Sequence, residues 1–223
     1  MNCQVTKRDS QGRALADYPR PSVAVDTAVL TVPPGGPLSV IAVTGDGDLR
    51  LPGTFLHEGE TLADAVTRSL AEKAGITGIH PVQLHVFDAP DRDDRGRVLS
   101  VAHLAPVRMS RLDAETRADP VRAQTELLPV AALPPMPFDH NAIVELAVAE
   151  LRARYAERPD PFGLLPEPTF TIRELHELHE AVAGHPLPRD TFRRLMEPQL
   201  TPTGSLARGT VGKPAREFTR SAA

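Results

Sequence analysis

The first half of the chain alternates hydrophobic and polar positions in a way that predicts a β-sheet. Within 22–32, valine and threonine recur at every second position, which would place them on one face of an extended strand. The stretch 33–37 reads PPGGP and is typical of a turn, and a second hydrophobic run follows at 38–44. We therefore expect a hairpin, followed by a loop at 45–48.

The spacing of hydrophobic residues then changes to one that favours a helix, from Thr61 to Lys73. Thr61 is a typical N-cap, and Asp64 three residues later suits a capping box. Gly75 is a typical helix terminator. The hydrophobic positions that share one face of this helix form the expected buried stripe: Leu62, Ala65, Val66 and Leu70.

Further strand and helix patterns follow between residues 82 and 155. Two runs, 82–88 and 97–107, predict strands joined by the charged loop APDRDDRG, and 126–134 fits another strand. A long helix is expected over 139–155. Its hydrophobic face is expected to contain Ile143, Leu146, Ala147 and Leu151.

The last part of the chain has its own pattern of helix-capping and helix-ending residues, which predicts a small separate domain. A capping box from Thr171 to Glu174 begins a helix over 171–184, and a second short helix is expected over 188–197. The tail fits two short extended pieces around a Gly-rich basic loop. The expected division is a flexible segment 1–17, a front domain 18–156 that includes helix 139–155, a linker 157–168, and a back domain 169–223.

Composition and charge narrow the class of protein. Hydrophobic residues make up 41% and charged residues 24% of the 223 residues, as in ordinary globular proteins. Cys3 is the only cysteine, so no disulfide forms within the chain and no cysteine-based zinc site exists. The polar start of the chain lacks the hydrophobic core of a signal peptide, and no run reaches membrane-spanning length. We expect a soluble, cytoplasmic protein.

The net charge of −4 conceals an asymmetry between the two ends of the chain. Residues 185–223 carry seven Lys or Arg against three Asp or Glu, which gives +4 for this part and −8 for the rest. A basic module on an acidic body suggests a polyanionic partner for the module. Chance clustering on a solvated surface is the alternative interpretation of the charge alone.

The stretch 51–76, LPGTFLHEGETLADAVTRSLAEKAGI, resembles a Nudix box. That family's pattern is a glycine, five residues, Glu, seven residues, then Arg-Glu-aliphatic-x-Glu-Glu-x-Gly-aliphatic. Thr54 stands at the first glycine, and Ser69 and Lys73 stand where two of the family's carboxylates belong. The positions that match the pattern are Glu60, Arg68, Leu70, Glu72, Gly75 and Ile76.

These departures predict weak or absent metal-dependent hydrolysis, with no catalytic residues and no required metal. On a helix, positions 69, 72 and 73 are expected to share a face, where three carboxylates would hold Mg²⁺. A lysine at about 4 Å and an effective dielectric of about 20 opposes each unit of like charge by roughly 4 kcal/mol. Glu72 remains as the single candidate ligand, and Mg²⁺ is expected only if the chain is a hydrolase after all. The resemblance implies that Arg68 braces the loop 54–60, whereas the residues alone suggest only an exposed ion pair with Glu72.

Nearly the whole chain, from about Tyr18 to Arg220, resembles the Nudix-related transcriptional regulators of the NrtR type. The resemblance rests on four segments: YPRPSVAVDTAVLTV (18–32), FDAPDRDDRGRVLSVAHLA (87–105), FTIRELHELHEAVAGHPLPRDTFRRLM (170–196) and VGKPAREFTR (211–220). It implies an α/β fold, namely a Nudix α/β/α sandwich with a mixed sheet, followed by a winged helix, in a homodimer. It also implies that ADP-ribose or a related NAD-pathway nucleotide controls genes of NAD metabolism. The resemblance favours a repressor, whereas the residues alone leave repression and activation open.

The second short helix of the back domain fits a DNA-recognition helix. Phe192, Leu195 and Met196 are spaced to pack inward. The outward positions are then available for phosphates or guanine edges of a palindromic double-stranded operator. The candidate DNA-binding residues are Arg189, Thr191, Arg193 and Arg194 on the helix, and Lys213 and Arg216 on the following hairpin. A basic appendage that only aids dimerisation is the alternative.

Arginines in the loop DRGR are candidates to clamp a pyrophosphate, because the guanidinium fork matches phosphate oxygens. The candidate ligand-binding residues are Arg20, Arg95, Arg97, Glu60 and Glu72. His103, on the strand that follows, is expected to be a core or edge histidine instead. Three other functions stay open: an ADP-ribose hydrolase using Glu60 and Glu72 with Glu58, a bifunctional protein, and a nucleotide-binding protein without a DNA role.

Overall fold

The computed structural model describes residues 7–45, 47–116, 125–207 and 214–220. Among them, a mixed sheet in the order β3-β2-β1-β6-β5 forms the centre of the front half, with β4 paired to β1 and β7 paired to β2. The strands are β1 (Ser22–Thr31), β2 (Ser39–Gly45), β3 (Asp48–Arg50), β4 (Gly53–Phe55), β5 (Val82–Phe87), β6 (Val98–Pro106) and β7 (Thr125–Pro129). Strands β1 and β6 run parallel and β1 and β2 run antiparallel, so the expected mixed sheet and hairpin are confirmed.

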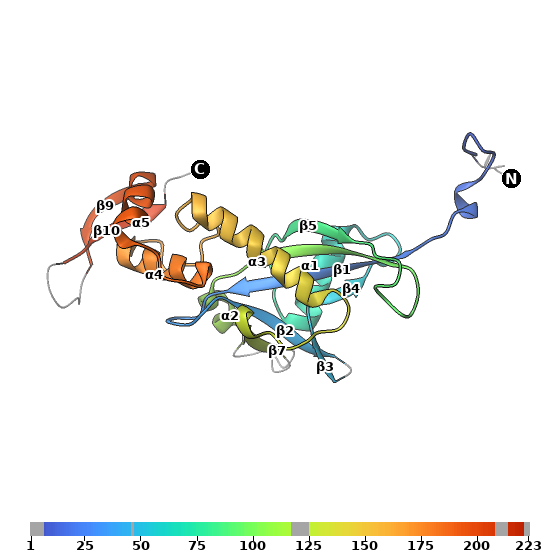
Figure 1. The fold of residues 1–223 in the computed structure, drawn as a ribbon, viewed down its shortest axis with the longest axis horizontal. Helices are drawn as coiled ribbons and strands as arrows, with labels where there is room; N and C mark the ends of the chain where they lie inside the picture. The colour runs from blue at the N-terminus through green and yellow to red at the C-terminus, as the bar shows by residue number, and fades with distance from the viewer. Residues whose placement is uncertain (1–6, 46, 117–124, 208–213, 221–223) are drawn as a thin grey trace.

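Two helices cover opposite faces of this sheet (Figure 1). The alternation along β1 decides which side chains each face receives. Val25 and Val29 share a buried cluster with α1 (Leu62–Ala74). Ala28 and Leu30 share another cluster with α3 (His140–Glu157). The layers are helix, sheet and helix, which confirms the expected α/β/α sandwich.

The ends of α1 agree with the sequence prediction. The Thr61 side chain accepts a hydrogen bond from the Asp64 N–H, the Asp64 carboxylate accepts one from the Thr61 N–H, and Gly75 adopts a left-handed conformation with φ of 59°. The prediction for α3 needs one correction: Leu146 is 37% exposed. Val144 and Val148 are buried instead, since the covered face of α3 is turned by part of a helical turn.

Three short elements depart from the sequence prediction. The loop expected at 45–48 is shorter, because Asp48–Arg50 turns back at Gly47 and pairs with Val43–Gly45 as strand β3. Strand β4 and helix α2 (Met109–Thr116) were not expected. The strand expected within 126–134 is β7, followed by a 3-10 turn over Val130–Ala132.

The carboxyl-terminal part is a winged helix, as predicted. Helices α4 (Ile172–Ala183) and α5 (Arg189–Met196) lie against a three-stranded sheet in the order β8-β10-β9. Its strands are β8 (Phe170–Thr171), β9 (Leu200–Leu206) and β10 (Arg216–Arg220). The Thr171–Glu174 capping box is present, and Gly184 ends α4 with φ of 80°.

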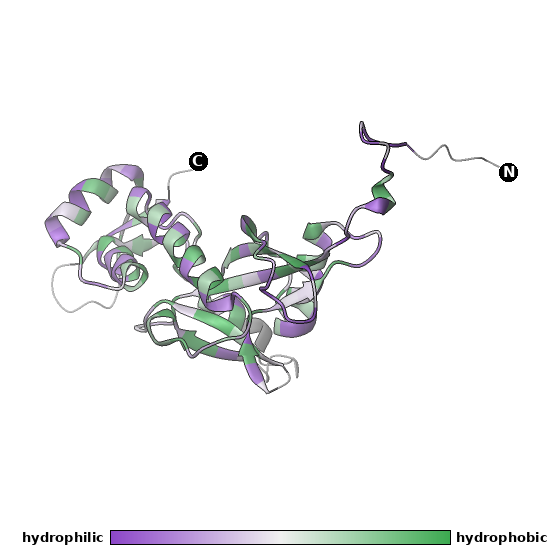
Figure 2. Cartoon of the chain, turned by 45° about the vertical axis from the view of Figure 1, so that its right-hand side comes forward, coloured by the Kyte–Doolittle hydropathy of each residue, from purple (hydrophilic) through white to green (hydrophobic). Residues whose placement is uncertain are grey.

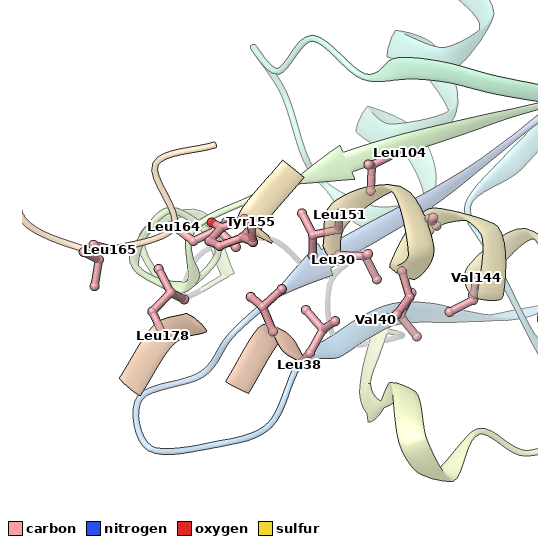
Figure 3. Close-up of a cluster of buried hydrophobic side chains, with 14 of the residues drawn as sticks. Leu30, Leu38, Val40, Leu104, Val144, Leu151, Tyr155, Leu164, Leu165 and Leu178 are labelled. Carbon is pink, nitrogen blue, oxygen red and sulfur yellow. The ribbon is translucent and has the colours of Figure 1, made fainter. Parts of the chain in front are cut away.

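A continuous hydrophobic core joins the two parts through α3. One buried cluster contains Leu30 and Val40 of the sheet, Leu151 and Tyr155 of α3, and residues of the winged helix such as Leu178 (Figure 3). Figure 2 shows mainly hydrophobic strands at the centre of the sheet and mixed hydrophilic and hydrophobic helices around it. Because this core is unbroken, α3 is a packed connection and not a free tether.

Polar contacts fix the far end of α3 to the winged helix. Arg152 donates to the carbonyl of Val182 at 2.9 Å, and Gln199 donates to the carbonyl of Glu157 at 3.2 Å. Tyr155 donates to the buried Asp160 carboxylate at 2.7 Å. No helix among the described residues has the length and hydrophobicity needed to cross a membrane.

Candidate functional site

The loop that leads into α1 is braced by Arg68, as the sequence predicted. Its guanidinium donates to both carboxylate oxygens of Glu60, at 2.7 and 2.9 Å. It also donates to the hydroxyl of Thr54 at 3.1 Å and to the carbonyl of Phe55 at 3.0 Å. One side chain of α1 therefore holds both ends of the loop 54–60.

Glu60 is consequently occupied by protein partners. The hydrogen bonds from Arg68, followed by the one from the His57 N–H, lower the pKa of Glu60 to about 2. Glu72 is different: its side chain is 62% exposed, and its nearest cation is Arg68 at 3.8 Å. Of the two box carboxylates, only Glu72 is open to solvent on this face.

The expected shared face of positions 69, 72 and 73 is only partly present. Ser69 is fully buried, and its hydroxyl has no hydrogen-bond partner within the described residues. Its position on the helix turns it toward the sheet, unlike the exposed Glu72. Lys73 reaches back and donates to the carbonyl of Gly53. Desolvation lowers the pKa of Lys73, and the nearby Asp26 and Glu72 partly offset this effect.

This donor set does not fit the divalent ions that the Nudix family uses. Magnesium needs several oxygen ligands on one side, but Glu60 is held by Arg68, and the Lys73 amine, which donates to the Gly53 carbonyl, is close enough to interact electrostatically with the remaining Glu72. Across the described residues, no three His, Cys, Asp or Glu side chains converge into a metal-binding group.

A buried polar network that the sequence analysis did not find lies at the start of α3. Asp26 of β1 is 8% exposed and accepts from the Ser100 hydroxyl at 2.5 Å. His140 Nε2 lies 3.3 Å from Asp26, and His140 Nδ1 accepts from the Leu51 N–H at 3.1 Å. This arrangement assigns the neutral tautomer with its proton on Nε2. No local pattern indicates the network, because its members are distant in sequence.

Asp26 stays charged in spite of its burial. Desolvation acts to raise its pKa, but hydrogen bonds from His140 and Ser100, together with the nearby Arg92, outweigh this effect and lower that pKa. Space at Asp26 depends on Gly53, because a Cβ there would lie 1.9 Å from the Asp26 carboxylate. The glycine therefore permits the sheet to close over the buried charge.

The loop between β5 and β6 contacts the start of α3 through an ion pair. Arg92 pairs with Asp139 at 2.6 Å, and its side chain is only 3% exposed. Arg95 pairs with Asp93 through two hydrogen bonds of 2.8 and 2.7 Å. The guanidinium carbon of Arg95 lies 5.5 Å from the ring centre of Phe55 and 5.1 Å from that of Phe138.

The other candidate ligand residues lie in different surroundings. Arg97 is exposed and donates to the carbonyl of Asp88 at 2.6 Å, which closes the β5–β6 loop. Arg20 is exposed just before β1, near the Arg97 backbone, whose carbonyl accepts from the Ser22 N–H at 3.0 Å. His103 is a buried strand residue, as predicted, and burial lowers its pKa.

Helix α5 exposes most of the predicted DNA-binding residues. Phe192 and Met196 are buried, whereas Leu195 is 53% exposed, so the prediction that Leu195 packs inward is wrong. With a helix of only two turns, the covered face is a single i, i+4 pair. The exposed side chains on this helix include Arg189, Thr191, Arg193 and Arg194.

The arginines of this surface differ in their partners. Arg193 pairs with Glu197 at 2.5 Å, and this pairing raises the pKa of Arg193. Arg189 and Arg194 form no ion pair within the described part of the chain. Arg216 is exposed at the start of β10, and Lys213, the other predicted contact of the hairpin, lies outside the described residues.

Comparison with known proteins shows what this chain is similar to. Residues 161–219 match the family model of the NrtR DNA-binding winged helix domain. The chain has 27% identity to a crystal structure of Shewanella oneidensis NrtR complexed with a 27mer DNA, with a TM-score of 0.72 over 89% of this chain and 93% of that one. The chain has the NrtR architecture. It is also 28% identical, over 81% of its length and 74% of the relative's, to the ADPR responsive transcriptional repressor NtrR of Acinetobacter baylyi.

The front domain of this chain has a relative of another kind. It is 33% identical to the ADP-ribose pyrophosphatase of Methanocaldococcus jannaschii, over 44% of this chain and 56% of that protein. A mutT/nudix family protein from Listeria innocua matches 62% of this chain at 27% identity with a TM-score of 0.54, which supports a Nudix fold, while the replacements Ser69 and Lys73 distinguish the box of this chain from the family pattern.

A groove of about 580 Å³ lies away from the Nudix box. It is lined by the β1–β2 turn with Pro33 and Gly36, by Leu165 of the linker, and by Glu174 and Leu178 of α4. The groove marks the meeting of the two domains on one side of α3, and none of the box residues reaches it.

Proposed function

We propose that this NrtR-type chain is a DNA-binding transcriptional repressor whose Nudix domain senses ADP-ribose or a related nucleotide. The observation that carries the proposal is the surface of α5, which exposes Arg189, Thr191 and Arg194 within the segment that matches a DNA-binding winged helix. The Acinetobacter relative is named for a response to ADPR, and the Shewanella structure holds DNA. Both names support the proposal for this chain.

Binding of DNA would follow from the charge and shape of α5. A short helix that buries only Phe192 and Met196 leaves the rest of its surface for the major groove. Arg189 and Arg194 are the principal candidates for phosphates or guanine edges, because neither has an acidic partner in the described structure. Arg193 would first have to break its ion pair with Glu197. Arg216, on the wing, would contact the phosphate backbone of the DNA.

Sensing without efficient hydrolysis follows from the occupied carboxylates. Glu60 braces the loop with Arg68, Ser69 is buried, and Lys73 brings a positive charge to the face of Glu72. An arrangement of this kind favours a nucleotide's negative phosphates over a cluster of divalent cations. The pyrophosphate would lie near Lys73 and the exposed Arg20 and Arg97, with Glu60 and Glu72 at the edge of the site.

Coupling between the two domains would pass along α3. At its start, His140 contacts Asp26 and Leu51, and Arg92 holds Asp139. At its end, Arg152 contacts the winged helix. A nucleotide that shifts the start of α3 therefore has a packed route to the position of α5, provided it binds the DNA-competent and incompetent states unequally.

Assembly and targets are proposed on the same basis. A homodimer would read a palindromic operator whose half-sites lie about 10–10.5 bp apart. The controlled genes would be those of NAD metabolism, because ADP-ribose arises from NAD. The proposed place of action is the cytoplasm, where the DNA and the nucleotide meet.

The second candidate function is hydrolysis of ADP-ribose, which the identity to an ADP-ribose pyrophosphatase favours. Incubation of the purified chain with ADP-ribose and Mg²⁺ or Mn²⁺ tests it, with release of AMP as the measurement. We expect no turnover above background. Robust turnover would show that the chain is an enzyme, or a bifunctional protein, and not only a sensor.

The deciding experiment for the repressor is a mobility shift on the chain's own promoter, with and without ADP-ribose. We expect specific binding that ADP-ribose changes. Arg189→Ala and Arg194→Ala should each weaken binding and lower the slope of log affinity against log salt by about 1. Arg13→Ala is the matched control, because the segment that contains Arg13 lies at the opposite end of the molecule from α5 (Figure 1).

The result that would contradict the proposal is equally specific. If DNA binding is absent, or if both helix variants bind as well as the Arg13→Ala control, α5 is not the recognition helix. Binding that is normal but unaffected by ADP-ribose and NAD⁺ would remove the sensor and leave only the DNA-binding part of the proposal.

A further inference from the structure

Two phenylalanines lie exposed against the same arginine beside the Nudix box. Phe55 is 39% exposed and Phe138 is 38% exposed. The guanidinium carbon of Arg95 lies 5.5 and 5.1 Å from their ring centres. We call these three residues the stacking cluster. They come from β4, from the residue before Asp139 at the start of α3, and from the β5–β6 loop, so three segments distant in sequence converge here.

The exposure of these rings is unusual among the phenylalanines of this chain. The chain has seven phenylalanines, and the five outside the cluster are buried or half-buried. Leaving more than a third of each ring exposed forgoes part of the free energy that full burial would supply. An exposed aromatic pair at one place is therefore better explained by a ligand than by folding.

The backbone at Phe138 supports a role other than stability. Its φ of 57° lies in the left-handed region, which a bulky residue rarely adopts. The conformation is kept by its surroundings: the His140 ring lies edge-on at 5.7 Å, and the Asn141 side chain accepts from the Met136 N–H at 2.8 Å. Strained backbone of this kind persists at sites where a side chain must be presented in one direction.

The Arg95 guanidinium presents a flat surface, and its positive charge is balanced by a carboxylate. Asp93 is buried and takes two hydrogen bonds from the Arg95 guanidinium, at 2.8 and 2.7 Å. These bonds, which lower the pKa of Asp93 to about 2, keep the pair ionised. Because the positive charge is matched by a carboxylate, this guanidinium is better suited to stack on a planar ring than to clamp a pyrophosphate.

We propose that the stacking cluster binds the purine base of the effector, between or upon the rings of Phe55 and Phe138 with the Arg95 guanidinium against it. The inference rests on the proposed function, because it assigns the base end of the nucleotide sensed by the Nudix domain. It divides the site: the base goes to the cluster, while the phosphates are left to the cations near the box. The carbonyl of Phe55 is held by Arg68, so the two parts adjoin.

This position also gives the base a direct way to act on α3. Phe138 is followed by Asp139, which pairs with Arg92, and by His140, which holds the buried Asp26. A base that reorients Phe138 would alter the first turn of α3. The effector's base, and not its phosphates alone, would then decide the response.

Calorimetric titration of the full chain tests the proposal with three probes: ADP-ribose, AMP, and ribose 5-phosphate, which has no base. Base stacking on an aromatic side chain is worth about 1–3 kcal/mol, so Phe55→Ala and Phe138→Gly should each weaken binding of ADP-ribose and AMP by about 5-fold to 150-fold. Binding of ribose 5-phosphate should not change. Glycine is chosen at 138 because it accepts the left-handed backbone.

Conservative and control variants separate stacking from misfolding. Phe55→Tyr and Phe138→Tyr keep the ring face and should retain affinity within about threefold. Leu127→Ala removes another exposed hydrophobic side chain from the same domain, on β7, and should leave all three probes unaffected.

The outcomes distinguish failure of the inference from failure of the proposed function. If the wild-type chain binds ADP-ribose and both truncated variants bind it equally well, the stacking cluster is refuted and the sensor stands. If the wild type binds AMP but not ADP-ribose, and the truncated variants weaken AMP, the proposed effector is refuted and the cluster stands. Absence of binding to either purine compound overturns both.

Discussion

At the scale of single residues, the chain relies on buried polar side chains that each have a specific partner. His179 of α4 is 3% exposed and lies edge-on to the rings of Tyr155 and Phe192, at 5.0 and 4.9 Å. Its Nε2 accepts from the Asp160 N–H at 3.4 Å, which requires the neutral ring. The burial of His179 lowers its pKa to about 4, although the Asp160 carboxylate opposes the shift.

The pKa of His179 predicts how stability changes with acidity. An unfolded histidine with a pKa near 6.5 takes up a proton that the folded ring refuses until about pH 4. The contribution of neutral His179 is therefore complete above pH 6.5 and is lost as the pH falls toward 4, by about 3 kcal/mol in total. Urea unfolding followed by circular dichroism between pH 4 and 8 measures this loss.

Two variants check that His179 causes the loss. His179→Gln should flatten the stability profile between pH 6.5 and 4, because the amide does not titrate. His57→Gln, at a loop position whose side chain is 64% exposed, should keep the wild-type profile. An unchanged profile in His179→Gln would assign the acid sensitivity to other groups.

At the scale of elements, α3 is the structural connection of the molecule. Its buried face packs on the sheet through residues such as Ile143 and on the winged helix through Tyr155. Beyond its last turn the chain bends at Asp160, whose φ is 47°. The Asp160 carboxylate accepts from the Leu164 and Leu165 N–H groups at 2.7 and 3.1 Å, and from Arg220 of β10. Local backbone, α3 and the wing sheet thus meet at one buried charge.

Removal of the Tyr155 hydroxyl should show how much the contacts of Asp160 stabilise the fold. Tyr155→Phe deletes the hydrogen bond to Asp160 and leaves part of a buried carboxylate without its partner. We expect the free energy of unfolding to fall by about 1–3 kcal/mol. Denaturant titration of the full chain measures the change.

The second tyrosine of the chain provides the matched control. Tyr18 also donates to an aspartate, Asp9, but in an exposed setting. Tyr18→Phe should change stability by less than about 0.5 kcal/mol. Equal effects of the two variants would show that burial at Asp160 contributes nothing beyond a surface contact.

At the scale of the whole molecule, one helix, α3, joins two different domains. The winged helix and the Nudix sheet lie at either end of α3 (Figure 1). The start of α3 is held by the buried set Asp26, His140 and Leu51. Since α3 and the cores on both sides are packed continuously, a change at its start is transmitted as a displacement and not absorbed by a flexible linker.

A variant at the start of α3 should separate DNA binding from its control. His140→Ala removes the contacts to Asp26 and Leu51 but lies far from α5. We expect the affinity of the nucleotide-free chain for operator DNA to change less than about threefold. The effect of ADP-ribose on that affinity should shrink at least about fivefold, as measured by fluorescence anisotropy.

Another buried histidine of the same domain serves as the control for this uncoupling. His103 is 6% exposed, and its Nδ1 contacts the Val101 carbonyl of its own strand at 3.0 Å, whereas no hydrogen bond joins it to α3 within the described residues. His103→Ala should leave the ADP-ribose effect intact. If the two histidine variants behave alike, the coupling does not depend on the first turn of α3.

The sequence by itself determined the elements whose signals are local. The capping boxes at Thr61 and Thr171 and the terminating glycines act within a few residues, so they fix helix ends wherever the helices lie. The resemblance to the Nudix box likewise implied that Arg68 braces the loop 54–60, and the structure shows this brace in the hydrogen bonds from Arg68 to Glu60 and Thr54. The replacements at Ser69 and Lys73 were also visible in the sequence.

Only the tertiary structure decided which distant side chains meet and which face water. Asp26 and His140, like Phe55 and Phe138, come from segments that no local periodicity connects, so their pairing depends on how the sheet and α3 pack. The exposure of Leu146 and Leu195 has the same cause, because periodicity gives a helix a hydrophobic side but the neighbouring elements decide how much of it they cover.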